Sequence, residues 1–327
     1  MSPRWRSALA FLWAAFVGAL FGLLVRFANS IPFLNPASHV SAVMTASYLI
    51  AAPLSIGFVS AISMQAERPS LASTIGGAWL ATLLSIGICM LFLLEGAICA
   101  VFMLPFALVL STIGGLLGWL LRGSTAKHRR STALCVALLP ILLPQLEVLT
   151  SAPTDIRTVQ TEIRIHAQPD VIWKNIARVR AIRPAELPPS WTQTIGFPRP
   201  VEATLSREGI GGVRLASFER GLLFLETVTG WEPNRLLAFT IKADTEHIPP
   251  TTLDRHVTIG GPYFDVLTGE YRIESIGPNE AVLHLASRER LSTNFNGYAS
   301  LWTDAVMRSI QKSILVVIKN RCEASNN

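Results

Sequence analysis

A small set of polar side chains in the C-terminal half could exchange protons with a substrate or clamp a polar ligand. Carboxyl, imidazole, phenol and guanidinium groups are the types that enzymes use for this work. The same residue types also occur on the solvent-exposed face of any sheet, so the sequence leaves open which of them point inward. The candidates on expected strands and in one long connection are Arg220, Glu226, His256, Tyr263, Asp265 and Arg288.

The connection between residues 244 and 265 also holds a weak metal-like pattern. Asp254-x-His256 lies there together with Glu246, His247 and Asp265. Two histidines in one loop are common without a metal, and the four cysteines form no CxxC pair and have no zinc-type Cys/His spacing. We therefore expect no metal site and no cofactor. The cysteines are Cys89, Cys99, Cys135 and Cys322.

Familiar catalytic motifs are absent from the sequence. There is no phosphate-binding P-loop, no H-E-x-x-H and no G-x-S-x-G. Gly209-Ile-Gly-Gly212 lies between two expected strands and is a turn, because a dinucleotide-binding glycine loop opens a helix. His166 and His284 lie on expected strands and are interpreted as surface or hydrogen-bonded core histidines. These motifs therefore identify no catalytic residue.

The composition indicates a membrane protein. Of 327 residues, 50% are hydrophobic and 15% are charged, and the mean hydropathy is +0.41, which is high for a soluble protein. Up to Thr150 there are 8 basic and 3 acidic residues, whereas the remainder has 20 basic and 19 acidic residues. The positive charge thus belongs to the apolar half, and a basic patch for nucleic acid is not expected.

Five apolar runs in the first half predict about five membrane-spanning helices, because a span needs about 20 mostly apolar residues. Glu95-Gly96 is the expected turn between the third and fourth runs, and we favour this over an intramembrane carboxylate. The fifth run is short and contains Pro140 and Pro144. Gly-x-x-x-Gly at 18–22 and 114–118 permits close helix contact. The runs are 7–25, 40–64, 71–93, 97–121 and 131–146, within a membrane region of residues 1–149.

Basic residues predict the orientation, because cytoplasmic loops are enriched in Lys and Arg. They occur before the first run, at Arg68, and from Arg122 to Arg130. These loops share one side, so the N-terminus is expected in the cytoplasm of a bacterial cell and the protein in its plasma membrane. With five spans the C-terminal domain is extracytoplasmic; if the fifth run does not cross, the domain is cytoplasmic. No series of buried charges indicates a transporter.

The second half has the pattern of an α+β domain. Apolar and polar residues alternate from Val159 to His166, as in a half-buried strand, and Gln168-Pro169-Asp170 begins a helix. Six further strands are expected, separated by turn residues. They are 201–207, 213–220, 222–231, 236–242, 266–276 and 281–291.

A long helix from Tyr298 to Arg321 closes the chain. Its apolar residues recur every three or four positions, which predicts one buried face packed on the sheet. The expected buried residues are Tyr298, Leu301, Trp302, Ala305, Val306, Ile310, Ile314, Val317 and Ile318. The expected polar side carries Asp304, Arg308, Lys312 and Lys319.

Two segments and this helix resemble the START-like or SRPBCC superfamily, in particular its polyketide cyclase and dehydratase group. The segments are Thr161-Glu-Ile-Arg-Ile-His-Ala-Gln-Pro-Asp-Val-Ile-Trp173 and Glu226-Thr-Val-Thr-Gly-Trp-Glu-Pro-Asn-Arg235. The resemblance covers residues 157–321. It implies a helix-grip domain, an antiparallel sheet wrapped on the terminal helix with an apolar pocket between them. That superfamily shares no catalytic residues, so the resemblance names no reaction.

The expected fold is therefore an α-helical membrane bundle followed by an α+β helix-grip domain. We expect the domain to bind a lipid or another hydrophobic small molecule near membrane lipids, with the connection 244–265 as a lid or a surface insertion. A cyclase- or dehydratase-type enzyme and an interaction or sensor module without ligand are the alternatives. The candidate pocket residues are Phe218, Arg220, Phe224, Glu226, Phe239, His256, Tyr263, Tyr271, Leu285, Tyr298 and Trp302.

Overall fold

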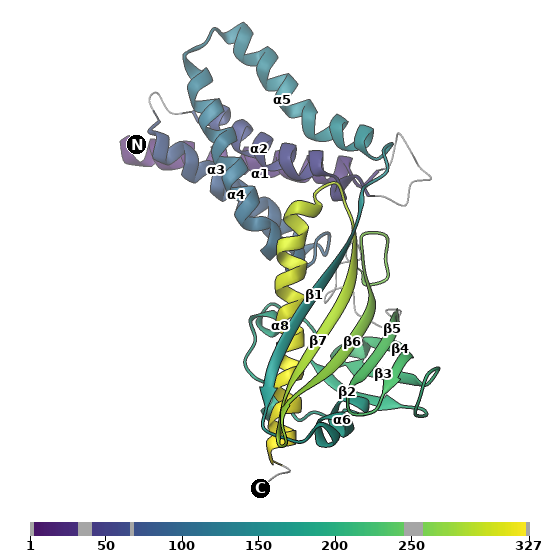
Figure 1. Ribbon diagram of the computed structural model, residues 1–327. Coiled ribbons are helices and arrows are strands. Elements are labelled where there is room, and N and C mark those ends of the chain that lie inside the picture. The colour runs from purple at the N-terminus through teal and green to yellow at the C-terminus, as the bar shows by residue number, and fades with distance from the viewer. Residues whose placement is uncertain (1–2, 32–40, 66–68, 245–257, 325–327) are drawn as a thin grey trace. The chain divides into compact units, whose positions relative to one another are not determined.

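The structure, a computed structural model, describes residues 3–31, 41–65, 69–244 and 258–324. It divides into two compact units. The first comprises Met1–Ala152 with Thr293–Phe295, and the second comprises Pro153–Ser292 with Asn296–Asn327. The first unit is helical, and the second contains all the strands of the described residues (Figure 1).

Five long helices make up the described part of the first unit. They are α1 (Pro3–Ala28), α2 (Ala46–Ser63), α3 (Leu71–Leu91), α4 (Ala97–Leu120) and α5 (Ala126–Glu147). Among the described residues, four stretches are long and apolar enough to cross a membrane: Trp5–Ala28, Ala46–Ser63, Leu71–Leu91 and Ala97–Gly123. The fifth apolar run lies within α5, whose first turns carry Lys127, Arg129 and Arg130. A fifth span remains a prediction.

Small residues let these helices approach one another closely, as the glycine spacing predicts. A Cβ atom at Gly114 of α4 would collide with the backbone oxygen of Leu54 in α2. A Cβ atom at Gly18 of α1 would come within 2.8 Å of the Cβ of Ala81 in α3. Both glycine motifs therefore lie at contacts between helices.

Glu95 lies in the connection between α3 and α4, where the sequence predicts a turn. Its Oε1 accepts a hydrogen bond from Nε of Arg26 at 2.5 Å. Arg26, which is buried, also donates to the carbonyl oxygen of Leu94 at 2.7 Å. Burying a guanidinium is costly unless it is paired. The need to pair Arg26 therefore explains the presence of Glu95, and no transport role is required.

The second unit is built on one seven-stranded antiparallel sheet in the order β1-β7-β6-β5-β4-β3-β2. After β1, each strand pairs with the next along the chain, as in a meander, and β1 closes the other edge beside β7 (Figure 1). The strands are β1 (Thr154–Ile165), β2 (Pro200–Leu205), β3 (Val213–Phe218), β4 (Leu223–Glu232), β5 (Leu236–Asp244), β6 (Phe264–Gly277) and β7 (Glu280–Ser292).

Helix α8 (Asn296–Ala324) runs along this sheet (Figure 1). Leu315, Ile318 and Cys322 of α8 belong to one buried core with strand residues such as Leu283. The short helix α6 (Pro169–Ala177) adds Ile172 and Ile176 to that core, and α7 (Trp191–Thr194) follows it in the chain. The predicted α+β helix-grip fold is confirmed.

Two assignments on α8 are wrong. Leu301, expected on the buried face, is 66% exposed. Asp304, expected on the polar side, faces β1 and binds Arg157. The reason is that β1 places Arg157 opposite this part of α8, where it pairs with Asp304. A helix face assigned from apolar residues alone misses the polar part of the contact.

Candidate functional site

Strand β7 directs both apolar and polar side chains toward α8. Leu283, Leu285, Ser287, Glu289 and Leu291 are all buried and lie at every second position. Successive residues of a strand point to opposite faces, so these five share one face. Leu283 and Leu285 belong to the core that includes α8. Ser287 and Glu289 therefore lie on the inner face of the sheet.

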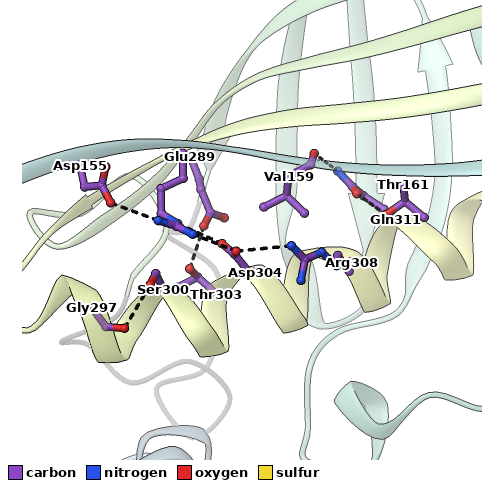
Figure 2. Close-up of polar contacts among 11 residues, drawn as sticks. Asp155, Val159, Thr161, Glu289, Gly297, Ser300, Thr303, Asp304, Arg308 and Gln311 are labelled. Carbon is purple, nitrogen blue, oxygen red and sulfur yellow. Dashed lines mark hydrogen bonds and ion pairs between the residues drawn. The ribbon is translucent and has the colours of Figure 1, made fainter.

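Glu289 is a buried carboxyl group with only one of its oxygens engaged. It is 0% exposed, and its Oε1 accepts a hydrogen bond from Oγ1 of Thr303 in α8 at 2.7 Å (Figure 2). Its Oε2 is buried and has no hydrogen-bond partner among the described residues. Burial raises the pKa of Glu289, although the bond from Thr303 opposes the rise. Such a group favours the neutral acid.

Gln311 links α8 to both neighbouring strands. Its Nε2 donates to the carbonyl oxygen of Val159 at 3.0 Å and to Oγ of Ser287 at 3.0 Å. Its Oε1 accepts from Oγ1 of Thr161 at 2.7 Å (Figure 2). A buried amide makes such bonds because leaving its polar atoms unsatisfied would destabilise the fold.

Arg157 and Asp304 complete the polar contact between β1 and α8. The guanidinium of Arg157 donates to both carboxylate oxygens of Asp304, at 3.1 and 2.9 Å, and to Asp155 at 3.3 Å. Arg308 lies 3.5 Å from the same carboxylate. We call the polar residues that connect α8 with β1 and β7 the helix-facing cluster. They are Arg157, Thr161, Ser287, Glu289, Thr303, Asp304 and Gln311.

A second group of buried polar residues lies on strands β3, β4 and β6. Arg214 is opposite Glu226 in the register of β3 and β4, and the two side chains form an ion pair. The guanidinium carbon of Arg214 also lies 5.5 Å from the ring centre of Phe239 and 5.9 Å from that of Tyr271. We call Arg214, Glu226, Tyr271 and Phe239 the Arg214 cluster.

Burial dominates the electrostatics of the Arg214 cluster. It raises the pKa of Glu226, while the positive charge of Arg214 opposes the rise. It also raises the pKa of Tyr271, so that this phenol is a neutral hydroxyl at physiological pH. The Nε of Arg214 is buried without a hydrogen-bond partner among the described residues. Groups of this kind, a cation beside an acid and a phenol, are those that bind or polarise a ligand oxygen.

The candidate pocket residues fall into several places. Phe239, Tyr271 and Leu285 lie in the main core, and Glu226 adjoins them through Arg214. Phe218 and Phe224 pack in a separate apolar cluster with Val179, Ala203 and Ala216. The structure thus brings together four of the candidates and sets these two phenylalanines apart from them.

The remaining candidates lie elsewhere. Arg220 is exposed and has a left-handed backbone conformation (φ 61°). Tyr263 is buried just before β6, and Tyr298 and Trp302 form an edge-to-face pair on α8 with ring centres 6.4 Å apart. Arg288 is exposed on β7, and Asp265 lies on β6. His256, with the connection's Glu246, His247 and Asp254, lies outside the described residues.

The sequence analysis missed three buried polar residues, which are Arg214, Glu289 and Gln311. The sequence contains one signal for Glu289. Every second residue of this strand from Leu283 to Leu291 belongs to one face, and Glu289 is one of these residues. Strand alternation could therefore have placed Glu289 inside. Arg214 alternates with the exposed Val213 and Leu215, so the apolar pattern of that strand indicated the opposite face.

Among the described residues, no group of three His, Cys, Asp or Glu side chains could hold a metal ion.

Comparisons with known proteins concern the second unit. No family model matches the chain, and no curated protein matches it. Among solved structures, it is similar to the Zhui aromatase/cyclase from Streptomyces sp. R1128, at 14% identity and a TM-score of 0.35, covering 53% of this chain and 97% of that one. It is also similar to truncated norcoclaurine synthase from Thalictrum flavum, at 13% identity and a TM-score of 0.30, covering 52% and 97%.

A third similar structure is a conserved protein from Geobacillus kaustophilus, at 11% identity and a TM-score of 0.33, covering 52% of this chain and 97% of that one. All three likenesses cover about half of this chain. At these identities and TM-scores they assign neither an activity nor a ligand to it. In the part of the chain that the structure describes, an N-terminal unit with four helices long and apolar enough to cross a membrane is followed by a helix-grip domain.

Proposed function

We propose that the helix-grip domain binds a hydrophobic small molecule that carries a polar group, on the sheet face that α8 covers. An apolar inner face supplies most of the binding free energy, about 25 cal/mol for each Å² of apolar surface buried. A few polar groups on the same face then orient the ligand. The inner face has this composition, with Leu237, Leu283 and Leu285 beside the Arg214 cluster.

The buried ion pair of Arg214 and Glu226 is the observation that carries this proposal. The two side chains are 4% and 9% exposed. A buried ion pair is costly to desolvate, and an apolar pair of similar volume often stabilises a fold as well or better. The fold alone does not require charges at these positions, whereas recognition of a polar ligand group does.

An enzyme of the cyclase or dehydratase kind is the second candidate. It is favoured by the placement of the Tyr271 ring against the Arg214 guanidinium, which is paired with the Glu226 carboxyl. A guanidinium and a phenol can polarise a carbonyl oxygen, and a carboxyl group can transfer a proton. In this reading the bound molecule is also the substrate.

The membrane helices would keep the domain at a bilayer, where hydrophobic molecules are concentrated. We propose that the N-terminus is cytoplasmic, that α5 crosses the membrane as a fifth span, and that the domain is therefore extracytoplasmic. The basic residues between α4 and the apolar part of α5 support this orientation, because such residues remain in the cytoplasm.

Ligand binding can be tested with the full-length protein in lipid nanodiscs. The methyl ester of cis-parinaric acid, a fluorescent apolar probe, would be titrated, with empty nanodiscs to subtract partition into lipid. We expect saturable binding by the wild type. Leu285→Trp, at an inner-face residue 5% exposed, should weaken it at least about tenfold. The matched variant Leu225→Trp, at a residue 40% exposed, should bind like the wild type.

Native mass spectrometry of the purified protein would show whether a small molecule co-purifies. If the wild type neither binds the probe saturably nor retains a molecule, the binding proposal is wrong. An interaction or sensor module without a ligand then becomes the better account. A bound molecule released with a changed mass would favour the enzyme.

A further inference from the structure

Glu289 has a more specific part in the proposed binding site, and this inference rests on the proposed function. Its carboxyl group lies between β7 and α8, with Thr303 on one oxygen and no partner on the other among the described residues (Figure 2). The side chain is fully buried. A buried polar atom without a partner is uncommon and calls for an explanation.

The neighbouring charges leave Glu289 without a cation of its own. Arg157 of β1 donates to both oxygens of Asp304 in α8 and also to Asp155 of β1. Arg308 of α8 is paired with the same Asp304. Among the described residues, none forms an ion pair with Glu289. A buried carboxyl group without a counter-charge is favoured as the neutral acid.

The position of the proton follows from the hydrogen bond. Oε1 already accepts a proton from the hydroxyl of Thr303. In the neutral acid, the proton therefore lies on Oε2, which is the oxygen without a partner. The group is then a hydrogen-bond donor, held in place by α8, that has no acceptor in the described part of the chain.

We propose that Oε2 of Glu289 donates a hydrogen bond to an uncharged oxygen of the ligand, a carbonyl, ether or hydroxyl oxygen. The ligand class is thus a neutral hydrophobic molecule with an oxygen function. A carboxylate ligand is disfavoured here, because it would bring another negative charge close to Asp155 and Asp304, which already engage Arg157 and Arg308.

Two probes with the same hydrocarbon chain test this in the full-length protein in nanodiscs. They are cis-parinaric acid methyl ester, which is neutral, and cis-parinaric acid at a pH where it is ionised. We expect the wild type to bind the ester about tenfold or more tightly than the acid, an effect of the size of one hydrogen bond or one buried charge. Tighter binding of the acid would overturn the inference.

Two substitutions separate hydrogen bonding from a structural role. Glu289→Gln keeps the shape and a donor, so ester binding should stay within about threefold of the wild type. Glu289→Leu has no donor and should lose about tenfold. The control is Glu162→Gln on β1, whose side chain is 66% exposed and which should change nothing. Thermal unfolding of each variant checks that it is folded.

The pH dependence gives a readout that a purely structural carboxyl group would not produce. Ester binding by the wild type should weaken as the pH rises and Glu289 loses its proton, while Glu289→Gln should bind equally across the range. Saturable ester binding that is the same in wild type, Glu289→Gln and Glu289→Leu, and flat with pH, would refute the role of Glu289 and leave the proposed function intact. No binding of either probe by the wild type would refute both.

Discussion

The guanidinium of Arg157 on β1 donates two hydrogen bonds to the carboxylate of Asp304 on α8, at 3.1 and 2.9 Å. This two-point contact ties an edge strand of the sheet to the terminal helix. The pair raises the pKa of Arg157, chiefly through the bonds to Asp304, so the charged form is favoured. The Asp304 side chain is only 17% exposed, and the contact therefore belongs to the packed interface of strand and helix.

A double-mutant cycle measures this contact. Arg157→Ala and Asp304→Ala should each lower the unfolding free energy, and together they should lose less than the sum, with a coupling of about 1–2 kcal/mol. Arg308→Ala is the control, since that side chain is 60% exposed and should cost under about 0.5 kcal/mol. Additive losses from the first two substitutions would show that the contact contributes nothing.

The buried face of α8 is tested by two leucines. Leu315 is 0% exposed and Leu301 is 66% exposed. Leu315→Ala should cost about 2–5 kcal/mol, because it removes packed methyl groups and leaves a cavity. Leu301→Ala should change stability by less than about 0.5 kcal/mol. Chemical denaturation of the purified protein gives both values, and equal losses would contradict this assignment.

Glu186 should make the protein sensitive to acid. Hydrogen bonds from Arg321 and from the backbone of Arg183 lower the pKa of Glu186 to about 2. Its unfolded pKa is about 4.3, so the carboxylate stabilises the fold above that pH, and this contribution is lost as the pH falls toward about 2. Glu186→Gln should thus lower the melting temperature near neutral pH and match the wild type near pH 2.

Arg321→Ala extends this test. Arg321 also donates to the carbonyl oxygens of Arg180 and Ala181, each at 2.9 Å. Its removal should therefore cost more than Glu186→Gln, by about 1 kcal/mol or more. If the two variants have the same melting temperature at neutral pH, the two carbonyl contacts do not contribute to stability.

Two glycines test the packing of the apolar helices in the first unit. Gly114 of α4 lies against the backbone of α2, whereas a Cβ atom at Gly87 of α3 would meet nothing within 4 Å. Gly114→Leu should push the helices apart and destabilise the unit by at least about 1–3 kcal/mol. Gly87→Leu should be tolerated. Melting temperatures in detergent compare the two, and equal tolerance would mean that α2 and α4 do not pack as described.

The number of spans is tested by reporter fusions at Thr125 and Thr154. These positions lie on either side of α5. With five spans the two reporters should lie on opposite sides of the membrane, with Thr125 in the cytoplasm. Reporters on the same side would show that the apolar part of α5 does not cross, and the domain would then be cytoplasmic.

Much of the architecture follows from the sequence because it depends on local patterns. The period-two alternation from Val159 and the turns at 232–234 and 277–279 predict β1 and the later hairpins, and the periodicity after Tyr298 predicts α8. Long apolar runs likewise predict the helices suited to a membrane. These signals can be read from the sequence because the spacing of apolar residues over a short stretch reflects the local secondary structure.

The inner-face polar residues depended on the tertiary structure. Arg214 lies between two exposed apolar residues and becomes buried only because β4 places Glu226 opposite it. Asp304 belongs to the interface only because β1, 147 residues away in the chain, brings Arg157 to it. A polar side chain is buried when a distant element supplies its partner. The local sequence pattern around a polar residue does not show which distant residue will be its partner. The secondary structure could therefore be predicted from the sequence, whereas the buried polar residues of the candidate site were decided by tertiary packing.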